Sequence, residues 1–157
     1  MKNPKMRNGF AMITAIFVMV IMASVGAFVM SLSGKIVKST TLQYQHEQAV
    51  LYAKSYTEFA VMAVTADDRT ANCLKTITGK AGTAPTAGNG YRIRTHISYI
   101  GPGSVIGGCP ATRQLSTAVI TTATPLTVII DAYVDYKDPD NTSGPWMTIH
   151  RRSVHKI

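Results

Sequence analysis

The distribution of hydrophobic and polar residues divides the chain into three parts with different periodicity. Residues 10–33 carry no charged side chain, and at about 1.5 Å per residue they are long enough to cross a hydrocarbon core of roughly 30 Å as one helix. Residues 34–66 repeat apolar positions every three to four residues, which is typical of an amphipathic helix. From Tyr91 onward the period falls to two, which predicts β-strands.

The amphipathic part continues the apolar part without a break. No proline occurs between Phe10 and Pro85, so one helix is expected to run from Phe10 to about Asp67. Its polar positions include Gln48, Lys54, Ser55 and Glu58. Its apolar stripe, which we expect to pack on the rest of the domain, comprises Ala49, Tyr52, Ala53, Tyr56, Phe59, Ala60 and Ala63.

The second half of the chain predicts about four antiparallel strands. Residues 67–90 are rich in Thr, Ala, Gly and Asn and predict a loop. Strands are expected over 91–99, 114–122, 126–137 and 146–156, with a turn at 138–145. In the first strand Tyr91, Ile93, Ile97 and Tyr99 should face inward, and Arg92, Arg94 and His96 outward. In the third, Leu126, Val128, Ile130, Ala132, Val134 and Tyr136 should face inward, and Asp131, Asp135 and Lys137 outward.

These elements predict an α+β fold. A long N-terminal helix, transmembrane in its first half and amphipathic in its second, should pack on one face of a roughly four-stranded antiparallel sheet.

Charge at the N-terminus predicts the membrane topology. Lys2, Lys5 and Arg7 precede the apolar stretch and should remain cytoplasmic, which places the residues after Lys35 in the periplasm. A cleavable secretory signal peptide would have a shorter apolar region, followed by a small-x-small site that is not seen just beyond Ser33. An ordinary single-pass anchor stays open. The net charge of +8 is scattered along the chain and predicts mainly solvated surface.

Two cysteines, Cys73 and Cys109, fall on the periplasmic side of this topology. In an oxidising compartment such a pair usually forms a disulfide. Two buried thiols, or a redox or metal site, are the alternatives. The chain has neither a C-x-x-C motif nor a histidine at ligand spacing, which favours the disulfide.

Candidate chemistry is sparse, and neither an enzyme nor a cofactor is expected. His96 and His150 could become neighbours on the polar sheet face, but surface histidines explain them better than a metal site. Asp138, Asp140 and Asn141 offer oxygen ligands for Ca²⁺, although they are also common turn residues. Four arginines could bind DNA with Tyr99 or Trp146 nearby, although a solvated face or a subunit contact is favoured. These arginines are Arg92, Arg94, Arg151 and Arg152.

The segment Arg7-Asn8-Gly9-Phe10-Ala11-Met12-Ile13-Thr14 resembles the class III signal of type IV pilins and type II secretion pseudopilins. The resemblance implies that a prepilin peptidase cuts between Gly9 and Phe10 and that the new amino terminus is methylated. It divides the chain into a leader (1–9), a transmembrane half-helix (10–33), an amphipathic half-helix (34–66), and a periplasmic loop and sheet (67–157). It also implies the same helix-on-sheet fold.

One position departs from the family pattern. Most members carry Glu at the fifth mature position, where it pairs with the amine of a neighbouring subunit, and this chain has Thr14 there. An uncharged residue makes the helix easier to hold in a membrane. Its lack of Glu resembles K-type and PilX-like minor components, which implies a place at the filament tip.

The expected function is therefore that of a minor pilin or pseudopilin of a type IV pilus or secretion filament. Its implied partners are other pilins, the prepilin peptidase, an inner-membrane assembly platform and membrane lipid. It would sit in the inner membrane and then enter a periplasmic or extracellular filament. The alternatives are an unprocessed single-pass protein with a partner-binding periplasmic domain, and a DNA-binding competence pseudopilin.

Overall fold

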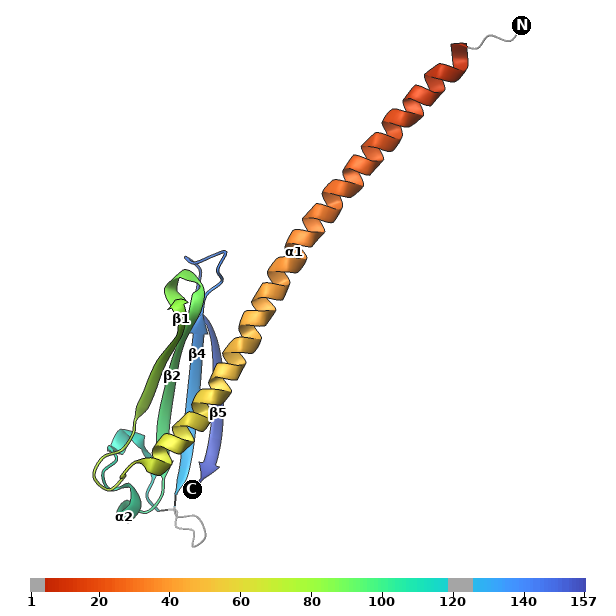
Figure 1. Cartoon of the computed structure of the whole chain (residues 1–157). Helices are drawn as coiled ribbons and strands as arrows, with labels where there is room; N and C mark the ends of the chain where they lie inside the picture. Colours follow the sequence, from red (N-terminus) through yellow and green to blue (C-terminus); the bar gives the residue numbers. More distant parts are fainter. Residues whose placement is uncertain (1–4, 119–125) are drawn as a thin grey trace. The chain divides into compact units, whose positions relative to one another are not determined.

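The computed structural model describes residues 5–118 and 126–157, and the side chains of 11–118 and 126–157 (Figure 1). The chain forms two compact units that divide between Gln43 and Tyr44. Helix α1 (Lys5–Ala66) contributes to both, and each unit is described separately.

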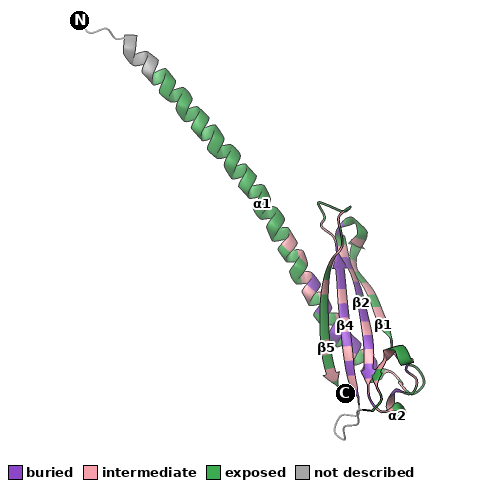
Figure 2. Cartoon of the chain, turned by 180° about the vertical axis from the view of Figure 1, so that it is seen from behind, coloured by how far each residue is buried: buried purple, intermediate pink, exposed green. Residues whose placement is uncertain are grey.

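The first unit contains the apolar part of α1. Every described side chain from Ala11 to Thr41 is exposed (Figure 2). The exposed residues include large hydrophobic side chains such as Phe17, Met22 and Phe28, which are 66%, 70% and 66% accessible. This helix is long and apolar enough to span a membrane. A lipid environment would remove the exposed apolar surface from water.

The second unit packs the rest of α1 on a sheet. Small residues line the buried side of the helix, since Ala49, Ala53 and Ala60 are completely buried. Helix α1 ends at Ala66, as expected from the sequence. One residue of the predicted apolar stripe was misplaced, because Phe59 remains 50% exposed. It lies at the border of the buried face, where the stripe turns away from the sheet.

Within the described residues the sheet has five strands, β1 (Thr76–Ala84), β2 (Asn89–Ile100), β3 (Gln114–Ser116), β4 (Thr127–Tyr136) and β5 (Met147–Lys156). The order is β1-β2-β4-β5, with all these neighbours antiparallel. The short β3 pairs in parallel with the end of β2, beyond the point where β1 pairs with it. The α+β class and the helix on an antiparallel sheet are confirmed, in an arrangement consistent with a pilin-like fold.

The predicted loop over residues 67–90 is wrong in part, because Thr76–Ala84 form strand β1. Its glycines and small residues have weak strand propensity, yet its backbone pairs with β2 from Thr76 opposite His96 to Ala81 opposite Tyr91. Gly79 explains part of this composition, because a Cβ at that position would overlap the ring and hydroxyl of Tyr56 on α1. The glycine that lowers strand propensity thus provides space for a helix side chain.

The other strand predictions agree in part. The inward residues expected in β2 and β4 are buried, and Arg92, Arg94, His96 and Asp131 lie on the opposite face. The strand expected over 114–122 is shorter, since β3 covers only Gln114–Ser116, and 119–125 lie outside the described residues.

The core consists of two clusters along the helix–sheet contact. One lies around Ala49, Ala53, Tyr91, Val134 and Tyr136. The other contains Ala60, Val64, Ile97, Tyr99, Ile130 and both cysteines. Short helical turns complete the fold and are η1 (Pro85–Ala87), α2 (Gly103–Ile106) and η2 (Ala111–Arg113).

Candidate functional site

The predicted cleavage position lies within α1. Gly9 and Phe10 have helical backbone, but their side chains lie outside those the structure describes. Cleavage between them stays a prediction. Thr14 lies one turn further along, and its hydroxyl donates a hydrogen bond of 3.0 Å to the Ala11 carbonyl. Such a local bond satisfies the hydroxyl donor within the helix itself.

The predicted disulfide is present. Cys73 and Cys109 are bonded, with their Cα atoms 4.7 Å apart, within the usual range for disulfides. Cys73 lies in the loop between α1 and β1, where the Tyr99 hydroxyl donates a hydrogen bond to the Leu74 carbonyl at 2.7 Å. Cys109 lies in the loop after α2, where the Gln114 side-chain amide donates to the Cys109 carbonyl at 2.6 Å. Burial raises the pKa of Tyr99 to about 12. The cysteines thus join two loops inside the core.

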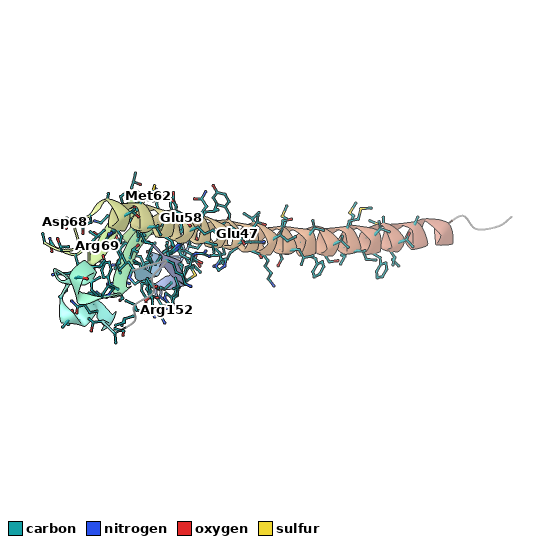
Figure 3. The ribbon with its side chains drawn as sticks, turned by 90° about the horizontal axis from the view of Figure 1, so that it is seen from below. Glu47, Glu58, Met62, Asp68, Arg69 and Arg152 are labelled. Carbon is teal, nitrogen blue, oxygen red and sulfur yellow. A yellow bond between two sulfur atoms is a disulfide. The ribbon has the colours of Figure 1, made fainter. Side chains whose placement is uncertain are left out.

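The face of the sheet opposite α1, called here the outer face, carries most of the charged side chains of the strands. It is formed by alternate residues of the strands, namely Thr76, Thr78, Lys80, Arg92, Arg94, His96, Asp131, Tyr133, Asp135, Thr148, His150 and Arg152. Figure 3 labels Arg152 on this part of the molecule. Positive side chains outnumber the two carboxylates.

Asp135 organises one half of the outer face. Its side chain is only 2% exposed, and its Oδ2 accepts hydrogen bonds from Arg94 at 2.9 Å and Arg92 at 3.3 Å. Its Oδ1 accepts a third from the Thr148 hydroxyl at 2.8 Å. The Arg92 guanidinium also lies over the Trp146 ring, 3.7 Å from its centroid. This carboxylate therefore orients both arginines.

Asp131 organises the other half. Its carboxylate accepts from Arg152 Nε at 2.7 Å and Nη2 at 3.0 Å, and His150 Nε2 lies 2.8 Å away. Hydrogen bonding to Arg152 lowers the pKa of Asp131, although burial opposes the shift. The His150 ring stacks on Tyr133 with the two planes 10° apart.

The neighbours of His96 include arginines, not a group of metal-ligating side chains. Its Nδ1 is 3.2 Å from Arg113 Nη2 and 3.4 Å from the Thr76 hydroxyl. Burial, together with Arg113 and Arg94, lowers the pKa of His96, which favours the neutral ring as a hydrogen-bond acceptor.

Two groupings that the sequence left open, both disfavoured there, do not form on this face. His96 and His150 are not neighbours, because β4 lies between their strands and Tyr133 contacts both rings. Among the described residues, no group of three potential metal ligands occurs. The four arginines do not share one face either, since Arg151 pairs with Ala132 and projects to the core side, where it stays exposed. Tyr99 is buried on the core side of the sheet, opposite Val128.

The calcium candidates form a turn. The backbone N–H of Asp140 donates to Asp138 Oδ1 at 2.9 Å, and that of Asn141 donates to the Asp138 carbonyl at 3.1 Å. A side-chain acceptor two residues before the donor is typical of an Asx turn. The arrangement accounts for these residues as turn-formers, and calcium binding stays a prediction.

Sequence reasoning missed several members of the outer face. Lys80 was placed in a loop, Arg113 was not considered, and the burial of Asp135 beneath two arginines was not foreseen. The alternation of opposite charges on neighbouring strands was a usable signal, but reading it required the strand register.

Comparisons with protein-family models, with curated proteins and with solved structures give no match.

Proposed function

We propose that this protein is a minor pilin or pseudopilin, a subunit that is inserted in the inner membrane, cleaved between Gly9 and Phe10, and assembled into a filament through its N-terminal helix. The observation that carries the proposal is the combination of one apolar, fully exposed helical segment with a small α+β domain built on the continuation of the same helix. The leader motif at residues 7–14 supports it independently.

The second half of α1 also supports assembly through helices. The side of the helix turned away from the sheet exposes Leu51 at 62%, Phe59 at 50% and Met62 at 63%. Glu47 and Glu58 lie on the same side, as Figure 3 shows. Exposed apolar side chains at helical spacing suit contact with another helix.

Thr14 supports a place at the filament tip. Threonine is uncharged, unlike the Glu of the family pattern, so Thr14 offers no negative charge to the amine of another subunit. A subunit with no requirement for a partner ahead of it is suited to begin a filament.

The test is intact mass and N-terminal sequencing of the protein from its native membrane. A mature chain should begin at methylated Phe10. The variant Gly9→Val should remain uncut, because a branched side chain blocks the close backbone approach that glycine permits. Asn8→Ala is the matched control and should still be processed. A wild-type chain that begins at Met1 would contradict the proposal.

An unprocessed single-pass protein with a partner-binding periplasmic domain is the second candidate. The outer face favours it, because a charged, organised surface is suited to a partner. An uncut leader, together with absence of the protein from sheared filaments, would support it. A DNA-binding competence pseudopilin is the third candidate, and salt-dependent retention of DNA by the full chain would support it.

A further inference from the structure

A surface pocket of about 180 Å³ lies between β1 and β2, lined by Thr78, Gly79, Lys80, Arg92, Ile93 and Arg94. The three charged residues of this lining are all cations. Each belongs to the outer face, so the pocket opens on the side of the sheet away from α1.

The strand register concentrates positive charge at this pocket. Lys80 lies directly opposite Arg92, and Arg94 lies two residues further along the same strand. Like charges directly opposite each other destabilise an antiparallel pair. Among the residues that the structure describes, Lys80 forms no ion pair. An anion bound between the strands would relieve this repulsion.

Asp135 neutralises only part of the charge. It is the one carboxylate that pairs with the lining residues in the described part of the chain, at 3.3 Å from Arg92 and 2.9 Å from Arg94. Three cations and one carboxylate leave two uncompensated positive charges at the pocket.

Arg92 and Arg94 are held in place but do not use all of their hydrogen-bond donors. In the described structure each donates one hydrogen bond to Asp135, while a guanidinium has five N–H donors. Stacking on Trp146, 3.7 Å from the ring centroid, holds the Arg92 guanidinium in place. Fixed donors of this kind bind an anion with little loss of side-chain freedom.

We propose that this pocket binds a phosphomonoester group. At neutral pH such a group carries a charge of about −1.5 to −2 and presents three strong acceptor oxygens, which matches two uncompensated positive charges and a set of free donors. A carboxylate or a phosphodiester, with a single negative charge, would neutralise only half of the excess. The phosphate is either free inorganic phosphate or a group on a larger molecule. This inference does not depend on leader cleavage or assembly.

Trp146 provides the readout, because it is the single tryptophan of the chain and contacts Arg92. The full chain in a non-ionic detergent is titrated at constant ionic strength with inorganic phosphate, O-phosphoserine or acetate. Tryptophan emission and titration calorimetry are recorded in parallel. Saturable binding of inorganic phosphate would identify free phosphate as a sufficient ligand, and binding of O-phosphoserine alone would identify a phosphorylated larger molecule. The proposal is overturned if acetate binds as tightly as the phosphate compounds. It is also overturned if neither inorganic phosphate nor O-phosphoserine gives any heat or any change in tryptophan emission.

Charge variants locate the site. Lys80→Gln should weaken phosphate binding roughly tenfold, since hydrogen bonds to charged groups are the strong ones. Lys156→Gln removes the same charge from the end of β5, on the same side of the sheet but opposite Thr127 of β4, and should change binding less than about twofold. Arg94→Gln is a second variant at the pocket. If Lys80→Gln and Lys156→Gln weaken phosphate binding equally, the binding reflects only the overall positive charge of the protein, and this result would contradict a site at the pocket.

Oligonucleotides separate the phosphomonoester from the phosphodiester. A single-stranded oligonucleotide with a 5′-phosphate should bind more tightly than the same strand without it. Equal affinity of the two strands would overturn the monoester assignment and favour backbone recognition of nucleic acid.

Discussion

At the scale of single residues, Asp135 has the largest expected effect on the outer face. Its buried carboxylate separates two arginines that would otherwise repel each other. Asp135→Asn removes the charge and keeps the shape, and should lower the free energy of unfolding by about 2 kcal/mol. Chemical denaturation of the full chain in detergent measures this.

Asp131→Asn is the matched control, because the Asp131 side chain is 14% exposed against 2% for Asp135. Its partner Arg152 is also largely solvated, with 64% of its side chain exposed, so the loss should be smaller. A loss for Asp131→Asn as large as for Asp135→Asn would contradict the role of burial.

His96 gives the protein a pH dependence of known sign. It is faced by Arg113, Arg94 and Asp131, by the Thr76 hydroxyl and by the Tyr133 ring. Because the pKa of His96 is lowered in the folded chain, its contribution to stability is complete above about pH 6.5, the unfolded value. That contribution is lost as the pH falls through the folded value.

The midpoint of thermal unfolding should therefore decrease on acidification below about pH 6.5, and His96→Gln should flatten this decrease. Arg113→Gln removes one of the cations that oppose protonation and should reduce the slope without abolishing it. A steeper slope in His96→Gln than in the wild-type protein would contradict the assignment.

At the scale of elements, β1 shows where sequence reasoning reaches its limit. The apolar helix, its end at Ala66, and the alternation in β2 and β4 could all be predicted because each follows from local periodicity. Strand β1 could not, since Gly79 and Gly82 lower its intrinsic propensity and only pairing with β2 makes it a strand. The basic pocket depends on that pairing, so it too was out of reach.

Gly79 tests this explanation of β1. Gly79→Ala should destabilise the domain by about 1 kcal/mol, because the added methyl group must displace the far end of the Tyr56 side chain. Gly103→Ala is the control, since a Cβ there meets no atom within 4 Å. Unfolding midpoints of the two variants give the comparison, and equal midpoints would exclude close packing as the reason for glycine in β1.

The disulfide joins elements that are far apart in sequence. Cys73 follows the end of α1, Cys109 follows α2, and 36 residues separate them. Its removal by the double variant Cys73→Ser, Cys109→Ser should lower the free energy of unfolding by roughly 3–4 kcal/mol. Adding a reductant to the wild-type chain should have a comparable effect in the same denaturation experiment. An unchanged midpoint in both would contradict a stabilising bond.

At the scale of the whole molecule, two different environments are expected along one helix. Residues 11–41 are exposed throughout, whereas three alanines of the following segment are fully buried on the sheet. Hydropathy alone predicts this division. A charge-free apolar run is suited to lipid, whereas an amphipathic repeat is suited to packing one side on the sheet and exposing the other to water. The proposed function does not follow from this division by itself, and cleavage at Gly9 stays a prediction.

Strand β5 carries a further consequence for the protein before it reaches any assembly. As the last strand in the sheet order, it has one edge that pairs with no described strand. Such edges are templates for uncontrolled strand addition and aggregation. Half of β5 is basic, namely His150, Arg151, Arg152, His155 and Lys156, so two copies approaching edge to edge would repel each other. Arg151, which is exposed and pairs with Ala132, adds to the positive charge along this edge.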